Sequence, residues 1–384
     1  MTNHLWTIHF MRICVANLLL FISLYMLFPV VPVEMADHLG VPVSQTGAMF
    51  LLLTLGMFAI GPFHAYLVDA YKRKYVCAFS FATMVAATVG YGFVNDITQL
   101  LLLCFVQGIA FGMATTAGIT LAIDITNTNL RSSGNIAFSW TARLGMLIGI
   151  ALGVGLYQWY DFKTLLYVSV IAGLAGIFFV SRVYVPFRAP IVTNLCSSDR
   201  FLLLRGWLPA FNLMLIAFIP GLLLPVFHNS LSDVFIGNIE IPFFAIVGVG
   251  FLFSALLARF VYREEKTLRV ITLGISLMMV SFILLKELPA IVTAILLGVG
   301  LGLVTPEFLL MFVKLSQHCQ RGTANTTHLL AWETGMSLGV AAACYLSTES
   351  SVDAVYHLGR ILTPIALLFF ILLTYPYFKK KRVR

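Results

Sequence analysis

Charged side chains are scarce in this chain of 384 residues, since Asp, Glu, Lys and Arg together make up only 10% of it. An ordinary soluble domain is about 25% charged and about 45–50% apolar, whereas 60% of this chain is apolar. The mean hydropathy is +0.95. This composition excludes a soluble globular domain, an intrinsically disordered chain and a secreted disulfide scaffold. It is typical of a protein whose outer surface contacts the hydrocarbon of a bilayer.

The sequence also lacks the residue patterns of an enzyme or a metal protein. Its six cysteines are scattered, and they show neither a disulfide framework nor the spacing of a metal site. There is no HExxH pair, no set of paired histidines and no nucleophile with an adjacent base. The basic residues do not form a face interleaved with stacking aromatic side chains. We therefore expect no enzyme, no resident cofactor or metal, and no nucleic acid as partner.

Long apolar runs are what the sequence has in abundance. A helix needs about 20 mostly apolar residues to cross the hydrocarbon core, and we identify about twelve such stretches. They cover residues 13–33, 46–68, 76–94, 100–122, 134–157, 164–185, 207–227, 242–261, 268–285, 289–313, 323–346 and 357–377. The runs do not alternate apolar and polar residues as the strands of a membrane barrel do. We predict an all-α membrane protein whose loops are too short to form a soluble domain.

The basic residues are distributed unevenly between the loops. If the N-terminus is cytoplasmic, 20 of the 24 lysines and arginines fall in cytoplasmic segments, and only Lys163 and Lys286 fall on the opposite side. This bias predicts that both termini are cytoplasmic. The net charge of +8 favours contact with anionic lipid headgroups. The N-terminus lacks the short apolar region and cleavage site of a signal peptide, so its first apolar run is expected to stay as the first span.

An internal repeat is visible at an offset of 190 residues. The matched pairs are Gly108 and Gly298, Gly112 and Gly302, Thr115 and Thr305, Arg131 and Arg321, Asn135 and Asn325, Gly145 and Gly335, Met146 and Met336, and Gly149 and Gly339. We predict two six-helix bundles, residues 1–185 and 205–384, related by a parallel pseudo-twofold axis and joined by a cytoplasmic linker at 186–204. Such a duplication places a polar cavity between the halves, and rocking about it gives alternating access. A channel would instead show a filter or a ring of like charge.

Three segments resemble signatures of the major facilitator superfamily. Residues 65–74 (AYLVDAYKRK) resemble its Gly-x-Leu-Ala-Asp-Arg-x-Gly-Arg-Lys motif at Leu67, Asp69, Arg73 and Lys74. Residues 104–108 (CFVQG) are similar to its Arg-x-x-Gln-Gly pattern, with Cys104 in the place of the arginine. The glycines between 145 and 155 resemble its glycine-rich antiporter motif, with Ile150 in the place of the usual proline. The resemblance covers the whole chain and implies secondary active transport of a small solute, commonly coupled to protons.

Ionisable residues inside spans are costly and usually face a cavity or a partner. The repeat places Arg143 and Glu333 at equivalent depths in opposite halves, where they either bind a charged or zwitterionic substrate or close on each other; alternatively, each is satisfied within its own half. Glu307 follows Pro306, and desolvation disfavours the charged form of such a carboxyl group, as proton coupling requires. The alternative is a neutral Glu307 bonded to backbone that Pro306 leaves unpaired. Arg360 is expected to extend towards the membrane interface.

Two further sets of residues are candidates for function. The polar or aromatic residues expected within or near cavity-lining spans are Gln107, Tyr25, Asn17, Asn212, Trp332 and His328. Ordinary hydrogen bonding between helices is the alternative role for each of them. A second set lies at the cytoplasmic ends of spans and is a candidate gate, comprising Asp69, Arg73, Asp124 and Arg131. The resemblance implies that role for Asp69 and Arg73, and the alternative is a solvated charged rim.

The sequence favours a proton-coupled exporter, an antiporter of small amphipathic molecules in a bacterial-type inner membrane. We expect a monomer whose partners are a small-molecule substrate and membrane lipids. The nearest alternative is a proton-coupled symporter for an organic anion, a zwitterion or a sugar. Sugar sites need many hydrogen-bonding side chains, and the predicted spans at 207–227 and 289–313 are strongly apolar. Sodium as the coupling ion, and a receptor or scaffold without transport, stay open.

Overall fold

The computed structural model describes residues 4–185, 195–197, 200–226, 233–236, 239–261, 267–317 and 320–382. Within these ranges, ten helices are long and apolar enough to cross a membrane. Two shorter apolar helical stretches begin at Phe243 and at Thr267. The prediction of an all-α membrane protein with about twelve spans is therefore confirmed. The predicted linker at 186–204 lies largely outside the described residues, and the predicted domain boundaries stay a prediction.

The first half of the chain contains six long helices and two short ones. They are α1 (Ile8–Tyr25), α2 (Val31–Leu39), α3 (Val43–Gly47), α4 (Met49–Ala70), α5 (Arg73–Gly90), α6 (Ile97–Ile125), α7 (Arg131–Trp159) and α8 (Phe162–Ser181). The predicted span at 13–33 is wrong at its end, because α1 stops at Tyr25 and α2 begins separately at Val31. Pro29 and Pro32 lie at this break, and proline cannot donate the hydrogen bond that a continuing helix needs.

The second half repeats the pattern of long helices and adds a small sheet. Its elements are α9 (Trp207–Leu223), β1 (Asp233–Ile236), β2 (Ile239–Pro242), α10 (Phe243–Val261), α11 (Thr267–Ile283), α12 (Ala290–Leu315), α13 (Arg321–Glu349), α14 (Val352–Phe369), a π-helical turn (Phe370–Thr374) and α15 (Tyr375–Lys381). The strands β1 and β2 pair antiparallel, and no pattern in the apolar runs predicts them.

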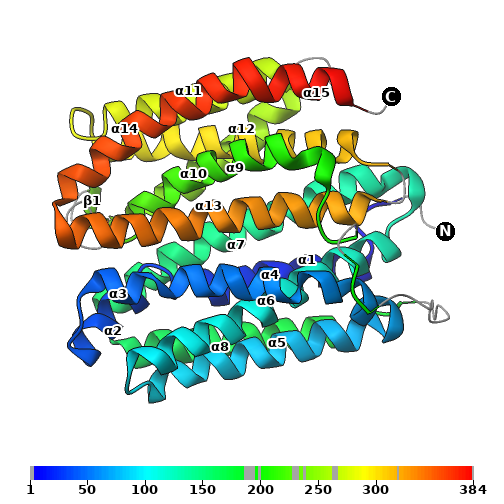
Figure 1. Ribbon diagram of the computed structural model, residues 1–384, viewed down its shortest axis with the longest axis horizontal. Helices are drawn as coiled ribbons and strands as arrows, with labels where there is room; N and C mark the ends of the chain where they lie inside the picture. The colour runs from blue at the N-terminus through cyan, green and yellow to red at the C-terminus, as the bar shows by residue number, and fades with distance from the viewer. Residues whose placement is uncertain are drawn as a thin grey trace.

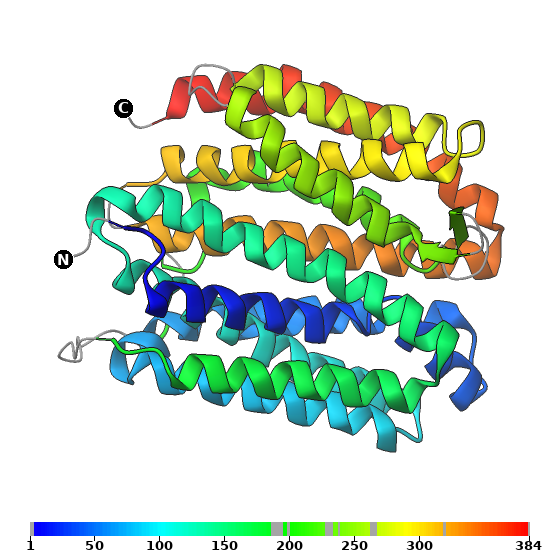
Figure 2. The same ribbon diagram turned by 180° about the vertical axis from the view of Figure 1, so that it is seen from behind.

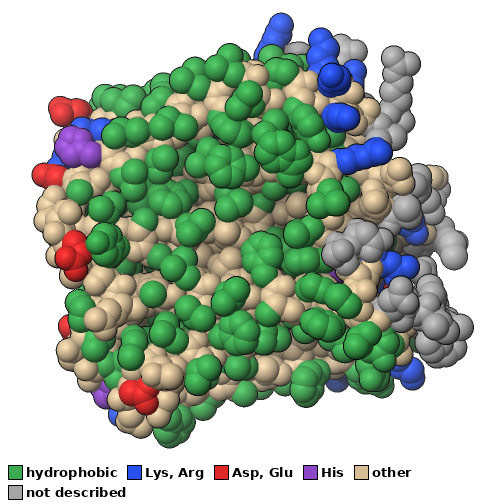
Figure 3. Space-filling view, in the orientation of Figure 1, with side chains coloured by type: hydrophobic (Ala, Val, Ile, Leu, Met, Phe, Trp, Pro, Cys, Tyr) green, Lys and Arg blue, Asp and Glu red, His purple; other side chains and the backbone are tan. Residues whose placement is uncertain are grey.

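The long helices run side by side along the longest axis of the molecule (Figures 1 and 2). Both termini lie at the same end, which we call the termini end, and the opposite one is the far end. Figure 3 shows lysine and arginine gathered mainly at the termini end and aspartate and glutamate at the far end, with apolar side chains between. Between the ends, the surface is suited to hydrocarbon.

Glycines matched by the repeat set the closest helix contacts in each half. A Cβ atom on Gly108 of α6 would lie less than 3.0 Å from the carbonyl oxygen of Leu53 in α4. A Cβ atom on Gly298 of α12 would likewise lie less than 3.0 Å from the carbonyl oxygen of Val247 in α10. The halves meet each other along two seams, where α13 contacts α3 and α4, and where α7 contacts α10.

Candidate functional site

A buried ion pair joins the two halves of the molecule. Arg143 of α7 and Glu333 of α13 approach with 3.2 Å between Nη1 and Oε1, and each side chain is only 1% exposed. The two residues are 190 positions apart, which is the offset of the repeat. The hydroxyl group of Tyr25 in α1 donates to the second carboxylate oxygen, Oε2. Of the arrangements left open by the sequence, the structure therefore contains the one in which the two charges close on each other.

An aromatic ring completes the surroundings of the guanidinium group. The Cζ atom of Arg143 lies 4.1 Å from the centroid of the Trp332 ring, a cation–π contact whose strength increases away from water. Arg143 Nε and Trp332 Nε1 have no hydrogen-bond partner within the described part of the chain. A buried donor without a partner costs about 1–3 kcal/mol. The site therefore retains donors that a ligand or water can satisfy.

A cavity of about 30 Å³ adjoins Arg143 on the side of the termini end. A water molecule needs about 10–15 Å³ of such volume, so the cavity holds about two. Besides Arg143, its polar lining comprises Asn17, Thr115, Asn135, Ser139, Asn325 and His328. Phe21 and Phe138 supply aromatic surface. The lining of the cavity thus combines polar and aromatic side chains.

Some polar side chains of the cavity have hydrogen-bond partners within the described part of the protein, and others have polar atoms without one. Asn17 donates its amide to the carbonyl oxygen of Phe138 (3.1 Å) and to the hydroxyl of Thr141 (3.0 Å), which ties α1 to α7. In contrast, Oδ1 of Asn325 and Nε2 of His328 have no partner among the described residues. These two residues are three positions apart on α13, a spacing that places them on one helix face. They are the groups best placed to hydrogen-bond a ligand.

Three predicted site residues lie away from this cavity. Gln107 accepts from Tyr91 (2.6 Å) and donates to Thr88 (3.3 Å) inside the first half. Asn212 donates to the carbonyl oxygen of Ala366 (3.0 Å) and so ties α9 to α14. Gln107 and Asn212 thus make hydrogen bonds within the protein, which was the alternative to a role in substrate binding.

Glu307 is the third residue outside the cavity. Its side chain is buried, and its hydrogen-bond partner is Thr267 at the start of α11. Its other carboxyl oxygen, Oε2, has no partner among the described residues. Leu309, rather than Glu307, is the residue that α12 contributes to the cavity wall.

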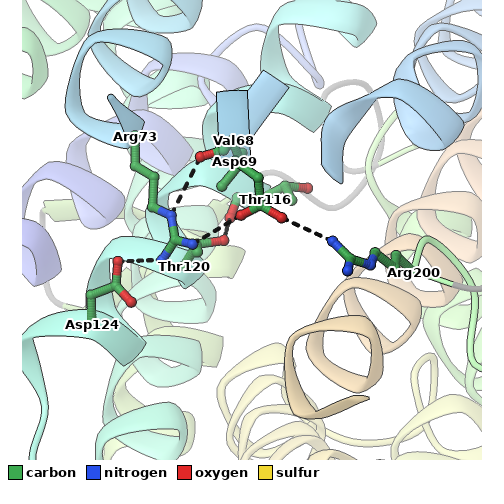
Figure 4. A network of polar contacts seen from close by, with 7 residues as sticks. All are labelled: Val68, Asp69, Arg73, Thr116, Thr120, Asp124 and Arg200. Atoms are coloured by element: carbon green, nitrogen blue, oxygen red, sulfur yellow. Dashed lines mark hydrogen bonds and ion pairs between the residues drawn. The ribbon is translucent and has the colours of Figure 1, made fainter. Parts of the chain in front are cut away.

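Three of the four predicted gate residues form one ionic network at the termini end (Figure 4). Arg73 of α5 pairs with Asp69 of α4 at 3.0 Å and with Asp124 of α6. Its Nε also donates to the carbonyl oxygen of Val68 (3.4 Å). Arg131, at the start of α7, lies outside this network, and its Nε has no partner in the described part of the chain.

The network continues into residues 200–206, which we call the connecting segment. Arg200 reaches Asp69 with 2.9 Å between Nη1 and Oδ2. Its carbonyl oxygen accepts from the hydroxyl of Thr323 in α13 (3.0 Å), and the backbone N–H of Leu203 donates to Thr327 (2.8 Å). The segment thus bridges α4 in the first half and α13 in the second.

An aromatic side chain anchors the connecting segment between the halves. Phe201 is 5% exposed, and its ring centroid lies 6.0 Å from that of Phe58 and 5.8 Å from that of His64. A Cβ atom on Gly61 would overlap the Phe201 ring, so this glycine makes room for it. In the sequence, Arg200 is only one of the basic residues whose uneven distribution indicates the orientation. The available clue was an apolar FLLL run directly after it.

Comparisons with known proteins agree with this architecture. The family model described as Major Facilitator Superfamily matches residues 13–339. No curated protein matches the chain. The human organic anion transporter MFSD10 (TETRAN) superimposes with a TM-score of 0.70 at 13% identity, covering 94% of this chain and 98% of that one. A variant of the nucleoside transporter NupG superimposes with a TM-score of 0.67 at 15% identity, covering 94% and 99%. At these identities the likeness to both structures concerns the fold.

Proposed function

Because the chain belongs to the major facilitator superfamily and is a secondary transporter, we propose that it exports a small amphipathic molecule in exchange for protons. The observation that carries this proposal is the buried Arg143–Glu333 pair, which joins the halves beside the cavity. A pair of this kind can open and re-form as the halves rock. The carboxylate of Glu333 can accept a proton, and its contact with Arg143 depends on whether that carboxylate is charged.

The proposed exchange rests on competition for one carboxylate. Ionised Glu333 attracts Arg143 and accepts from Tyr25. Protonation removes the negative charge, which weakens the attraction across the halves and frees the guanidinium group. A substrate bound beside Asn325 and His328, with its apolar part against Phe21 and Phe138, would have to widen this small cavity and would thereby disturb the same pair. Because a proton on Glu333 and a substrate that engages the same carboxylate exclude each other, the protein carries them alternately.

The membrane orientation is part of the proposal. The concentration of lysine and arginine at the termini end (Figure 3) supports cytoplasmic termini by the positive-inside rule. In that orientation the cavity beside Arg143 lies on the cytoplasmic side of the ion pair, and the connecting segment belongs to the cytoplasmic gate. We place the protein in an inner membrane of bacterial type, acting as a monomer.

A thermal-stability screen of the purified protein tests the proposed substrate class. A ligand at 100 times its Kd stabilises the folded state by about 2.7 kcal/mol, enough to raise Tm measurably. We expect lipophilic amphiphiles to raise Tm in the wild type and not in Glu333→Gln. Stabilisation by an organic acid or a zwitterion, lost in Arg143→Gln, would instead favour the symporter. That second candidate is supported by the unpartnered Nε of Arg143.

Replacing Glu307 by Gln is expected to leave the pH dependence of transport in place. Glu307 faces Thr267 instead of the cavity, so it is not positioned to compete with substrate. We expect the exchange rate in proteoliposomes to change less than about threefold, with its pH profile unshifted. A flat pH profile in this variant would assign proton coupling to Glu307 and contradict the role proposed for Glu333.

Replacing Asp69 by Asn is expected to loosen the cytoplasmic gate. Asp69 binds both Arg73 and Arg200, so its loss removes the ionic contacts between α4 and the connecting segment and leaves the packing of Phe201. In a Cys-free background, Asn325→Cys should then react faster with a maleimide added from the cytoplasmic side. Arg200→Ala should have a smaller effect, because Arg200 is 49% exposed and exposed ion pairs contribute about 0–1 kcal/mol. Lys72→Ala is the control, and equal labelling rates in all three variants would rule out the gate.

A further inference from the structure

The second seam between the halves contains an open groove. It has a volume of about 380 Å³ and lies between α7 and α10, which run side by side on the near face in Figure 2. Residues between Leu144 and Trp159 form one wall, and Pro242 with α10 residues up to Leu252 forms the other. Each wall therefore belongs to a different half of the protein.

The groove faces outward and its lining is apolar. Ile148 and Leu152 on one wall are 40% and 41% exposed, and Val249 and Leu252 on the other are 61% and 50% exposed. None of the residues that line it is titratable. Since a bound water needs two to four polar partners, water is a poor occupant. Hydrocarbon is the medium that this part of both helices would contact.

The groove extends from the far end towards the middle of the membrane. Trp159, at the far end of α7, lines it and is 64% exposed, and the next residue, Tyr160, is 67% exposed. Tryptophan and tyrosine concentrate at the headgroup level of a bilayer. The entrance of the groove thus lies at headgroup depth, and its inner part lies at the depth of acyl chains.

Glycines keep the groove open. Gly145 and Gly149 of α7 pack against the backbone of α1, and Gly153 packs against Met26 just after α1. At each of them a Cβ atom would lie less than 3.0 Å from a carbonyl oxygen. Gly155 differs, because its nearest neighbours would be Trp159 and Pro242 at 3.8 and 3.9 Å. Gly248 on the opposite wall would meet only Leu147, at 3.8 Å. These two glycines leave space unfilled instead of bringing helices together.

We propose that the groove binds one acyl chain of a lipid from the leaflet at the far end. The acyl chain fills an apolar groove whose lining offers water few hydrogen-bond partners. It contacts both halves of the protein at once. Its binding therefore stabilises the arrangement of α7 and α10 seen here against the rocking that separates them. Lipid chains in this groove would bias the conformational equilibrium without occupying the central cavity.

Photocrosslinking of the full chain tests this binding site. The protein is reconstituted in phosphatidylcholine vesicles containing a phosphatidylcholine with a diazirine in its acyl chain, and labelled peptides are mapped. We expect labelling around Val249 (61% exposed) to exceed by at least fivefold that around Ile171 of α8 (63% exposed). Gly155→Leu combined with Gly248→Leu should fill the groove and remove the excess.

The matched control is Gly92→Leu, an exposed glycine whose Cβ atom would meet only Leu166, at 3.8 Å. It should leave the labelling pattern unchanged. If the double variant does not fold, Gly248→Val alone can be used. It should fill part of the groove and remove part of the excess labelling. Equal labelling of α8 and α10, or a pattern that the groove-filling variants leave intact, would overturn the proposal. Because the readout is lipid contact, the result does not depend on the direction or coupling of transport.

Discussion

Replacing Glu333 by Gln is expected to abolish transport and to lower the thermal stability of the protein. The substitution keeps the shape of the side chain but leaves the charge of Arg143 buried at 1% exposure without its counterion. Removing one partner of a buried ion pair costs about 3–5 kcal/mol. Arg143→Gln should have the same two effects, because it leaves an uncompensated carboxylate in the same place.

The double variant Arg143→Gln with Glu333→Gln separates the structural role of the pair from its function. Replacing both charges with neutral groups of similar volume is often neutral or stabilising, so Tm should recover towards the wild-type value. Transport should stay lost, because neither the carboxylate nor the guanidinium group is present. A control is Lys286→Gln, at the exposed pair with Asp353, which should change neither property. Near-normal transport by Glu333→Gln would rule out the proposed role.

Leucine at Gly108 or Gly298 is expected to prevent correct folding. In each case the new Cβ atom would lie less than 3.0 Å from a backbone carbonyl oxygen, that of Leu53 or Val247. Ordinary overpacking costs about 1–3 kcal/mol, and here the obstacle is backbone, which cannot move aside as a side chain can. The detergent-solubilised variants should lose the monodisperse peak in size-exclusion chromatography.

Gly322→Leu is the matched control for the two glycine variants. No atom lies within 4 Å of a Cβ atom at this position, so the variant should elute as the wild type does. The two glycines are related by the repeat, and we expect them to behave alike. If one variant folds normally while the other does not, the halves do not pack through equivalent contacts.

Most of the architecture follows from the sequence because the bilayer imposes long apolar segments. The predicted span at 13–33 extends past the end of α1 for a local reason. Hydropathy measures how apolar a segment is and does not detect that Pro29 and Pro32 interrupt the helix. The strands β1 and β2 are four residues each, too short to stand out as apolar runs next to the predicted spans. The dipeptide Gly237-Asn238 in the sequence between them is of a kind that favours a two-residue hairpin turn.

The equivalent depths of Arg143 and Glu333 were predictable from the repeat, whereas their pairing was one of several arrangements that the sequence left open. Arg143 and Glu333 are rare charges in apolar helices, and their offset equals that of the matched glycines. The direction in which Glu307 points was not predictable, because α12 is apolar on all sides and its hydrophobic pattern does not fix its rotation. The role of Arg200 depends on how the connecting segment folds back between α4 and α13, and neither periodicity nor composition contains that information.

Distance measurements between spin labels test most directly the claim that the two halves alternate under control of Glu333. One pair, Tyr71→Cys and Gln317→Cys, reports on the termini end, and another, Asn95→Cys and Ser350→Cys, reports on the far end; all four residues are exposed. The native Cys196 and Cys319 are replaced by serine in both. We expect the two distances to change in opposite directions when the pH is lowered, and Glu333→Gln to remove that response. Distances that do not respond to pH, that change together, or that respond equally in Glu333→Gln would contradict the account.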